Sequence, residues 1–350
     1  MKSLTLPLLL FQSLVIACTV QPKGDDLVLS DKIPEISEAQ ILKTPGYYNW
    51  GASICKDENG LYHLFYSRWK KEYSFYGWLT HSEIAHAISK HPAGPWEYKQ
   101  TELRGRGKGH WDAITAHNPK IKYFDGKYYL YYISTNLGDR DFSQAELVET
   151  AQTGYDHSNW KILRPNQRTG VAVSNSIYGP WKRMDQPLIE PSGPITTLTV
   201  NPAIDQGKDG KYYLIVKGDK PNETNFVRNQ AIAISDSPTG PFRMHEKPVI
   251  DYMDTEDMST WYDEARERFY GVFHAHTFIG LITSPGGLNW EKAHDHTITT
   301  KNIRMKDGTI WKPGRLERPF IYTENGRPTV LSLAARDGDN SYTVCIPLNP

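Results

Sequence analysis

The chain contains, at residues 125–132, the sequence Asp125-Gly126-Lys127-Tyr128-Tyr129-Leu130-Tyr131-Tyr132, a short polar turn followed by aromatic and aliphatic residues. Asp-Gly before such a run is a strong hairpin signal, because both central positions of a type I′ turn require positive φ. The pattern recurs four more times, with weaker turn signals in the last two copies. These copies are Asn59 to Tyr66, Asp209 to Val216, Arg266 to Phe273 and Asn325 to Leu331.

Two further patterns alternate with the hairpins. A strand of small apolar residues, a turn and an aromatic residue occur together at Ala85 to Trp96, Gly170 to Trp181, Ala231 to Phe242 and Gly280 to Trp290. Short segments that align with one another precede the hairpins at Trp50 to Ile54, His117 to Ile121, Val200 to Ile204, Glu256 to Thr260 and Glu317 to Ile321. A two-sheet sandwich with coincidental repeats is the alternative. The regular order instead predicts an all-β chain folded as a single five-bladed β-propeller with four-stranded blades.

Composition is consistent with such a fold and excludes some functions. The 350 residues include 40 Lys+Arg and 40 Asp+Glu, and 12% are aromatic. A net charge of zero argues against nucleic acid as a partner, because binding to phosphates needs a basic excess. The 23 Pro and 27 Gly favour many short elements separated by turns.

The first residues predict export and lipidation. Residues 1–17 have the features of a secretory signal peptide, with Lys2 before an apolar core that is too short to span a bilayer. The segment before Cys18, Val15-Ile16-Ala17, resembles a bacterial lipobox, in which the cysteine carries fatty acids such as palmitate. An ordinary signal peptide with a chance cysteine is the alternative. We therefore expect a tether over 18–40 and the propeller over 41–350. The expected location is a lipid anchor on the outer membrane, at the cell surface or the periplasmic face.

Cysteine gives no metal signal. Cys55 and Cys345 form either one disulfide or two buried thiols, and their spacing is not that of a metal site. No metal and no cofactor is therefore predicted, although a structural Ca²⁺ in the central channel would be compatible with a propeller.

The inner strand segments, the Asp-Gly-Lys-Tyr-Tyr hairpins and the Gly-Pro-Trp turns together resemble the five-bladed propeller glycoside hydrolases. These include families 32, 43 and 62 and, most closely, the family 117 group that acts on algal galactans. The resemblance covers about residues 45–335 and is most specific at Gly109 to Pro119, Glu256-Asp257 and Leu316 to Pro319. It implies glycosidase chemistry. One departure is that residues 48–53 lack the Asp that these families carry on the first inner strand.

Four residues are the catalytic candidates. Asp257 and Glu317 come first, because they occupy corresponding positions in neighbouring blades and match acidic positions of family 117. Asp112, just before the second inner strand, is expected to face them across the funnel, and His117 is an alternative general acid. A structural pair between Glu317 and Arg318 or Arg315, and a turn-forming role for Asp112, are the competing interpretations.

Charge, hydrogen bonding and stacking identify the substrate-binding candidates. They are Arg68, Trp50, Trp111, Asn118, Asn201, Lys217, Arg228, His274 and Arg318. Cations around the funnel predict a carboxylated or sulfated substrate, because guanidinium groups bind such oxyanions in a bidentate manner. Solvated surface charges and packing aromatics are the alternatives.

The sequence thus predicts an exo-acting glycoside hydrolase. The expected substrate is an acidic or sulfated oligosaccharide of algal or plant cell-wall type, cleaved by inversion, beside other polysaccharide-degrading enzymes. Inversion is favoured because no nucleophile is evident on the first blade. A glycan-binding propeller lipoprotein without catalysis and a glycoside phosphorylase are the two alternatives.

Overall fold

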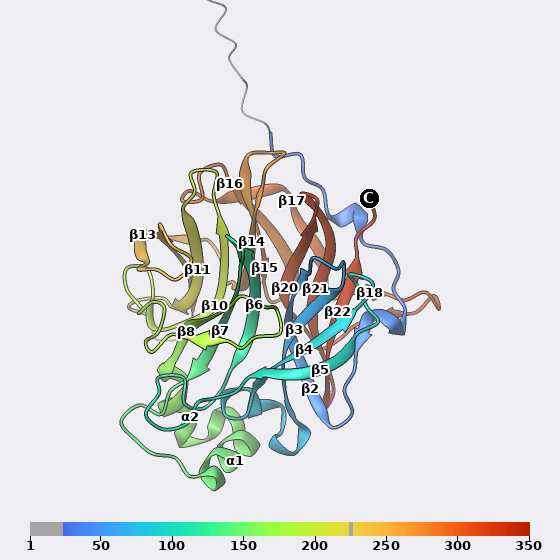
Figure 1. Ribbon diagram of the computed structural model, residues 1–350. Helices are drawn as coiled ribbons and strands as arrows, with labels where there is room; N and C mark the ends of the chain where they lie inside the picture. The colour runs from blue at the N-terminus through green and yellow to red at the C-terminus, as the bar shows by residue number, and fades with distance from the viewer. Residues whose placement is uncertain (1–23, 224–226) are drawn as a thin grey trace, which may run out of the picture.

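The protein is a five-bladed propeller. The computed structural model describes residues 24–223 and 227–350, in which five four-stranded antiparallel sheets are arranged as blades (Figure 1). This confirms the predicted fold. The expected signal peptide, residues 1–17, and the expected lipidation site, Cys18, lie outside the described residues. No helix in the described ranges is both long and apolar enough to cross a membrane.

Each of the first four blades is built from four consecutive strands. In chain order these are β2 (Tyr47–Lys56), β3 (Tyr62–Lys70), β4 (Glu83–Ser89) and β5 (Glu97–Leu103); β6 (His117–Phe124), β7 (Lys127–Thr135), β8 (Gln167–Ser174) and β9 (Lys182–Arg183); β10 (Thr196–Gln206), β11 (Tyr212–Asp219), β12 (Arg228–Ser235) and β13 (Arg243–Ile250); and β14 (Glu256–Asp263), β15 (Arg268–His274), β16 (Phe278–Ser284) and β17 (Glu291–Thr300). The hairpins fall where the repeats predict them: Asp125 and Gly126, between β6 and β7, both have positive φ (48° and 78°).

The fifth blade joins the two ends of the described chain. It consists of β20 (Arg315–Glu324), β21 (Arg327–Asp337), β22 (Asn340–Pro347) and β1 (Ile41–Leu42), and a small β18–β19 ribbon (Ile303–Arg304 and Ile310–Trp311) precedes it. Ile41 pairs with Val344 and Leu42 with Thr343, so an early strand closes the sheet formed by the last three.

Residues 24–40, expected as part of a tether, pack against the fourth and fifth blades. Leu27, Leu29 and Ile36 are buried in the largest hydrophobic cluster, with residues of both blades. The backbone amides of Leu29 and Ser30 donate to Asp295 Oδ2 at 2.6 and 2.8 Å. The folded domain therefore begins well before residue 41, because this segment carries its own apolar side chains.

The five innermost strands share one irregularity. Each has a register shift in its pairing with the next strand, at the residue where φ is positive. These residues are Gly51, Asn118, Asn201, Asp257 and Arg318, with φ between 43° and 63°. Gly, Asn and Asp adopt this left-handed conformation most readily. The aligned segments of the sequence thus occupy equivalent places, and each strand bulges at the same level around the axis.

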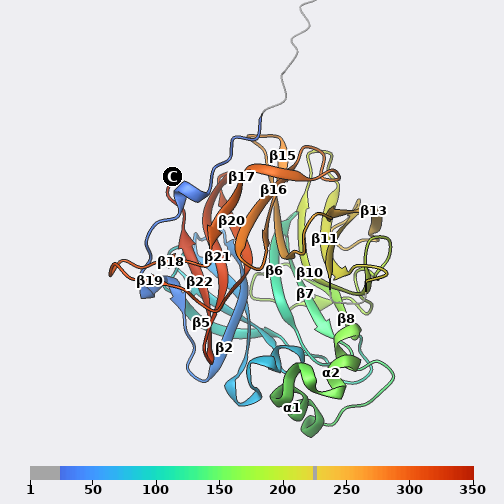
Figure 2. The ribbon, with the colours of Figure 1, turned by 180° about the vertical axis from the view of Figure 1, so that it is seen from behind.

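A helical insertion between β7 and β8 covers one end of the propeller. It contains α1 (Gln144–Thr153) and α2 (Ser158–Leu163), which lie together at the end of the molecule remote from residue 24 (Figures 1 and 2). Leu147, Trp160 and Leu163 of the insertion pack against Leu79 of the 3₁₀ turn η4 (Phe75–Leu79) in one hydrophobic cluster. This packing fixes the insertion against the first blade.

Candidate functional site

The five bulged residues meet at the axis, where the side chains of four of them close the channel. We call Gly51, Asn118, Asn201, Asp257 and Arg318 the axial ring. Asn118 Nδ2 donates to Asn201 Oδ1 (2.7 Å), Asn201 Nδ2 donates to Asp257 Oδ1 (2.5 Å), and Arg318 Nη1 donates to that same oxygen. At Gly51 an added Cβ would lie 3.0 Å from Asn118 Oδ1, so glycine makes room for the neighbours. The cavity at this level is only about 10 Å³.

A much larger cavity of about 470 Å³ lies against the ring, and we call it the central pocket. Inner strands contribute the residue immediately before the bulge in four blades: Trp50, His117, Glu256 and Glu317. The other lining residues are Phe75, Trp78, Tyr155, Trp160, Lys161, Arg164, Pro165, Thr197, Lys217, Asp219, Arg228, Arg315 and Arg318. The bulge thus turns one residue toward the pocket and the next toward the axis. The axial ring forms the floor.

Two carboxylates from adjacent blades line this pocket. Glu256 on β14 accepts from Lys217 Nζ at 2.5 Å, and Arg228 Nε lies 3.7 Å from its other oxygen. Glu317 on β20 accepts from Arg315 Nε at 2.6 Å. Burial alone would raise the pKa of both carboxyls, but Lys217 holds that of Glu256 well below its usual range, and Arg315 lowers that of Glu317. Both groups are therefore ionised at neutral pH.

A neutral histidine lines the same pocket. The ring of His117 is buried next to Trp69 and Trp78, with centroid distances of 5.7 and 5.9 Å, and its Nδ1 lies 2.7 Å from Ser82 Oγ. Burial, helped by the charge of Arg318, lowers the pKa of His117 well below its usual value. The imidazole is uncharged at neutral pH, so it has one donor and one acceptor nitrogen.

Aromatic side chains form much of the pocket wall. Trp50 packs edge-on against Phe75 (5.2 Å between centroids), and Trp78 packs edge-on against Trp160 (5.3 Å). Phe75 and Trp78 come from η4, whereas Trp160 and Tyr155 come from the helical insertion. Flat rings of this kind offer stacking surfaces to a sugar.

Asp257, His274 and Glu317 offer ligand atoms within 4.8 Å of one another, the spacing that a metal ion needs. Asp257 Oδ2 and His274 Nδ1, 3.9 Å apart, have no hydrogen-bond partner among the described residues. However, Arg318 is paired with Asp257, and Arg315 neutralises Glu317. Two cations already balance the two carboxylates, which disfavours a divalent cation here.

Most of the predicted site residues lie in or next to the central pocket and the axial ring. Trp50, His117, Lys217, Arg228, Glu317 and Arg318 line the central pocket. Asn118, Asn201 and Asp257 lie one residue further along their strands, in the axial ring, where Asp257 is a hydrogen-bond acceptor of the floor. His274, opposite Glu256 in the β14–β15 pairing, is buried beside Asp257.

Three further predicted residues lie away from both the central pocket and the axial ring. Asp112 is fully buried, pairs with Arg106 (2.5 Å) and Arg183 (3.0 Å) and accepts from Tyr132 Oη (2.8 Å), so it does not face Glu317 across the funnel. The other two are also held by neighbouring side chains: Trp111 stacks on Tyr132, and Arg68 forms an ion pair with Glu83 at 2.7 Å.

Sequence reasoning missed several lining residues. Glu256 stands among the polar residues of the inner strands, but the sequence favours its neighbour Asp257, because the direction of each side chain depends on the bulge. The Asn-Pro motifs at Asn118 and Asn201 are the signal that could have located it, since Asn tolerates positive φ. Tyr155, Trp160 and Arg164 belong to an insertion that has no counterpart in the other repeats.

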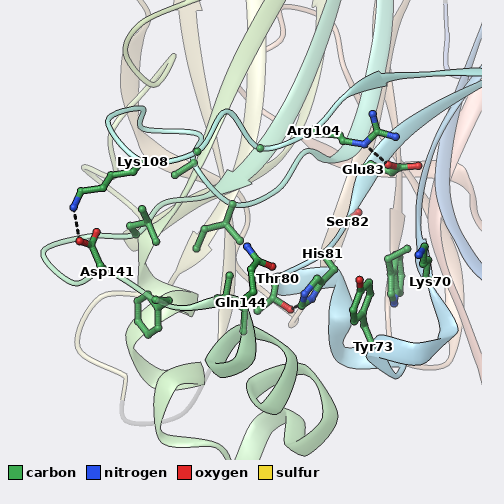
Figure 3. A pocket seen from close by; sticks show the side chains of 18 of the residues that line it. Lys70, Tyr73, Thr80, His81, Ser82, Glu83, Arg104, Lys108, Asp141 and Gln144 are labelled. Carbon is green, nitrogen blue, oxygen red and sulfur yellow. Dashed lines mark hydrogen bonds and ion pairs between the residues drawn. The ribbon is translucent and has the colours of Figure 1, made fainter.

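A second cavity, of about 600 Å³, lies beyond the segment 71–80 that forms one wall of the central pocket. Figure 3 shows two ion pairs along it, Lys108 with Asp141 and Arg104 with Glu83. His81 stacks on Tyr73 at 3.7 Å between centroids, and burial lowers its pKa to about 4. This cavity lacks a buried pair of carboxylates, so we regard the central pocket as the candidate site.

Comparison with known proteins shows the fold. No family model matches the chain, and no curated protein matches it. Among solved structures, Zg3597, a family 117 glycoside hydrolase from the marine bacterium Zobellia galactanivorans, aligns over 90% of both chains with a TM-score of 0.60 and 17% identity. BT0996, solved as an RGII complex, aligns over 91% of this chain and 92% of its own, with a TM-score of 0.64 and 12% identity. An endo-arabinase from Bacteroides thetaiotaomicron aligns over 91% of this chain and 98% of its own, with a TM-score of 0.56 and 13% identity.

Proposed function

We propose that the protein is a glycoside hydrolase whose reaction takes place in the central pocket. The observation that carries this proposal is the convergence of Glu256 and Glu317, from adjacent blades, on one closed-ended pocket with aromatic walls. Glycoside hydrolysis uses such a pair, one carboxyl group to protonate the leaving oxygen and one to activate water. The similarity in fold to a protein named as a family 117 glycoside hydrolase and to one named as an endo-arabinase supports it.

The two carboxylates differ in environment, which suggests their roles. Glu256 is held ionised by Lys217 and Arg228, which suits the base that accepts a proton from water. Glu317 is the remaining carboxyl group and takes the role of the acid, which requires its protonated form. Arg315 lowers its pKa and the negative charge of Glu256 acts in the opposite direction, so this form increases as the pH falls. With these roles the reaction is a single displacement that inverts the anomeric carbon. His117 lies within the same pocket and supplies a neutral hydrogen-bonding group to the sugar.

The proposed substrate is the end of an acidic or sulfated oligosaccharide. The axial ring blocks the pocket at its floor and the helical insertion contributes its side, so a chain end fits better than a chain interior. Six cationic side chains line the pocket against three carboxylates, so the pocket favours a negatively charged sugar.

Hydrolysis can be tested with panels of acidic algal and plant oligosaccharides and with the variants Glu256→Gln and Glu317→Gln. We expect each to lower kcat/KM by about 10² to 10⁴-fold, the usual worth of a general acid or base. Glu317→Gln should retain more activity on an aryl glycoside with a good leaving group, which needs no acid. Glu324→Gln, at the other end of β20, is the matched control. Sugar release that survives both pocket variants would refute the proposal.

Phosphorolysis is a second candidate, and the cationic surplus of the pocket is what favours it. In that reaction inorganic phosphate replaces water as the attacking group, and the base becomes unnecessary. Turnover that requires phosphate and persists in Glu256→Gln would favour this candidate over hydrolysis.

We also propose that the enzyme is lipid-anchored through Cys18 to the outer membrane. This rests on the sequence of residues 1–18 alone. A Cys18→Ala variant should move from the membrane fraction to the soluble fraction of the cell, and an unchanged distribution would contradict the anchor.

A further inference from the structure

Among the six cations of the central pocket, Lys161 is exposed to solvent, and Arg164 differs from the other four. Arg318 pairs with Asp257, Arg315 with Glu317, Lys217 with Glu256 and Arg228 with Asp219, the last at 2.7 Å. Arg164, which follows α2 at the end of the helical insertion, forms no such ion pair with any described carboxylate, and its buried Nη1 has no hydrogen-bond partner there.

The position of Arg164 is set by the packing around it. Trp160 and Leu163, just before it, are buried against Leu79, and the following Pro165 also lines the pocket. Asn159 Nδ2 donates to Thr150 Oγ1 at 3.1 Å and ties α2 to α1. The guanidinium is therefore presented to the pocket by a fixed element rather than by a loose surface chain.

An unpaired guanidinium with a buried Nη1 is unfavourable in the free protein. Burial removes its water, and nearby Arg228 adds repulsion; together they lower the pKa of Arg164 to about 10, which leaves it charged at neutral pH. Asp219 and Glu256 act in the opposite direction but are already paired with Arg228 and Lys217. A bound oxyanion would supply both the missing charge and the missing acceptor.

We propose that Arg164 is the specificity residue for an oxyanion group on the substrate, a carboxylate, sulfate ester or phosphate. This rests on the proposed function for its sugar part, and it names the group that selects the acidic sugar. The oxyanion accepts from the Arg164 guanidinium in a bidentate manner, on the side of the pocket that Arg228 and Glu256 share. A neutral sugar leaves Arg164 unpaired and binds less tightly.

The test measures binding, so it does not depend on turnover. Calorimetry at constant ionic strength would use D-glucuronate, D-galactose 6-sulfate and inorganic phosphate, with D-glucose and D-galactose as neutral partners. We expect at least one anion to bind the full protein, and Arg164→Gln to weaken it tenfold or more. Arg243→Gln, which removes an exposed charge on β13, is the control and should bind like the wild type.

Thermal unfolding without ligand separates this role from a structural one. Because the unpaired charge is unfavourable, Arg164→Gln should raise Tm in the absence of an anion and should lose the rise in Tm that the anion gives the wild type. Lower stability of Arg164→Gln without ligand would indicate a structural residue and overturn the proposal, as would equal anion binding by both proteins. Anion binding that survives in an inactive Glu256→Gln protein would support this inference even if hydrolysis were refuted.

The three anions distinguish the sources of the charge. Preference for glucuronate over glucose indicates a uronic acid, and preference for galactose 6-sulfate over galactose indicates a sulfated sugar. Phosphate binding alone would assign the site to inorganic phosphate, as phosphorolysis requires.

Discussion

Lys217 of the third blade and Glu256 of the fourth form an ion pair with 2.5 Å between Nζ and Oε2, and Lys217 is almost completely buried. Lys217 Nζ also lies 3.8 Å from Asp257 in the floor. One lysine thus links a wall carboxylate with a floor carboxylate, and its charge keeps Glu256 deprotonated where burial would favour the protonated form.

Removing that charge should change the pH dependence of the reaction. In Lys217→Met the main charge that offsets the burial of Glu256 is absent, so the pKa of Glu256 should rise toward and above its usual value. Activity that needs ionised Glu256 should then be lost at higher pH than in the wild type, so the acidic limb of the kcat/KM profile shifts upward by about one unit or more. An acidic limb that stays in place would show that Glu256 is not the titrating base.

Asp112 should be important for stability and not for chemistry. Asp112→Asn leaves Arg106 and Arg183 without their shared carboxylate, and breaking such a buried pair costs about 3–5 kcal/mol. Urea unfolding should show this loss, while kcat of the folded variant stays close to wild type. Asp185→Asn, an exposed partner of Arg106, is the control and should change stability by less than about 1 kcal/mol. A large fall in kcat for Asp112→Asn would return it to the catalytic group.

Lys120 should make stability depend on pH in the neutral to alkaline range. It lines the small cavity of the axial ring, over the ring of Phe320, and burial lowers its pKa from near 10.5 to about 7. Between these values the unfolded chain binds more protons than the folded one, so this residue makes stability rise with pH from about 7 to 10.5, with its full cost present below pH 7.

Lys120→Met should therefore raise Tm most at pH 6–7, and the gain should shrink as the pH approaches 10.5. Lys122→Met is the matched control two residues along β6, and it should lower Tm because Lys122 pairs with Asp205 at 3.1 Å. A gain for Lys120→Met that does not vary with pH would argue against a buried, titrating lysine.

Strand β1 and the segment before it should contribute much of the stability of the propeller. A chain that starts at residue 44 lacks β1 and the buried side chains of Leu27, Leu29 and Ile36, each worth about 1.5–3 kcal/mol of burial. Compared with a chain that starts at residue 24, it should unfold at a temperature lower by many degrees. Equal unfolding temperatures would mean that three strands suffice for the fifth blade.

The sequence was sufficient to predict the blades, because turn and strand signals are local and recur. Asp125-Gly126 and the aligned inner segments each carry their own physical signal, and the repeats place them in order. The site was predictable to within one residue on each inner strand. A bulge reverses which of two neighbours faces the pocket, so the sequence favours Asp257 where Glu256 lines the wall.

Other parts of the site could not be predicted, since they depend on contacts between distant segments. The insertion that carries Trp160 and Arg164 occurs once, and only its packing on Leu79 shows that it borders the pocket. Asp112 comes shortly before an inner strand in sequence, yet it pairs with Arg106 of the same connecting segment and with Arg183 of β9, the outermost strand of the second blade. Neither packing nor charge pairing between distant segments leaves a local signal in the sequence.

The pairing of Ile41 with Val344 also means that the fifth blade can be completed only after the end of the chain has been synthesised. A ribosome releases the chain from its first residue onward, so four blades can form while β20, β21 and β22 are still being made. Until then the nascent pocket lacks Glu317, Arg315 and Arg318, three of the groups that give it its charge balance. The central pocket and the circular shape of the propeller are therefore completed together, when the last three strands form one sheet with β1.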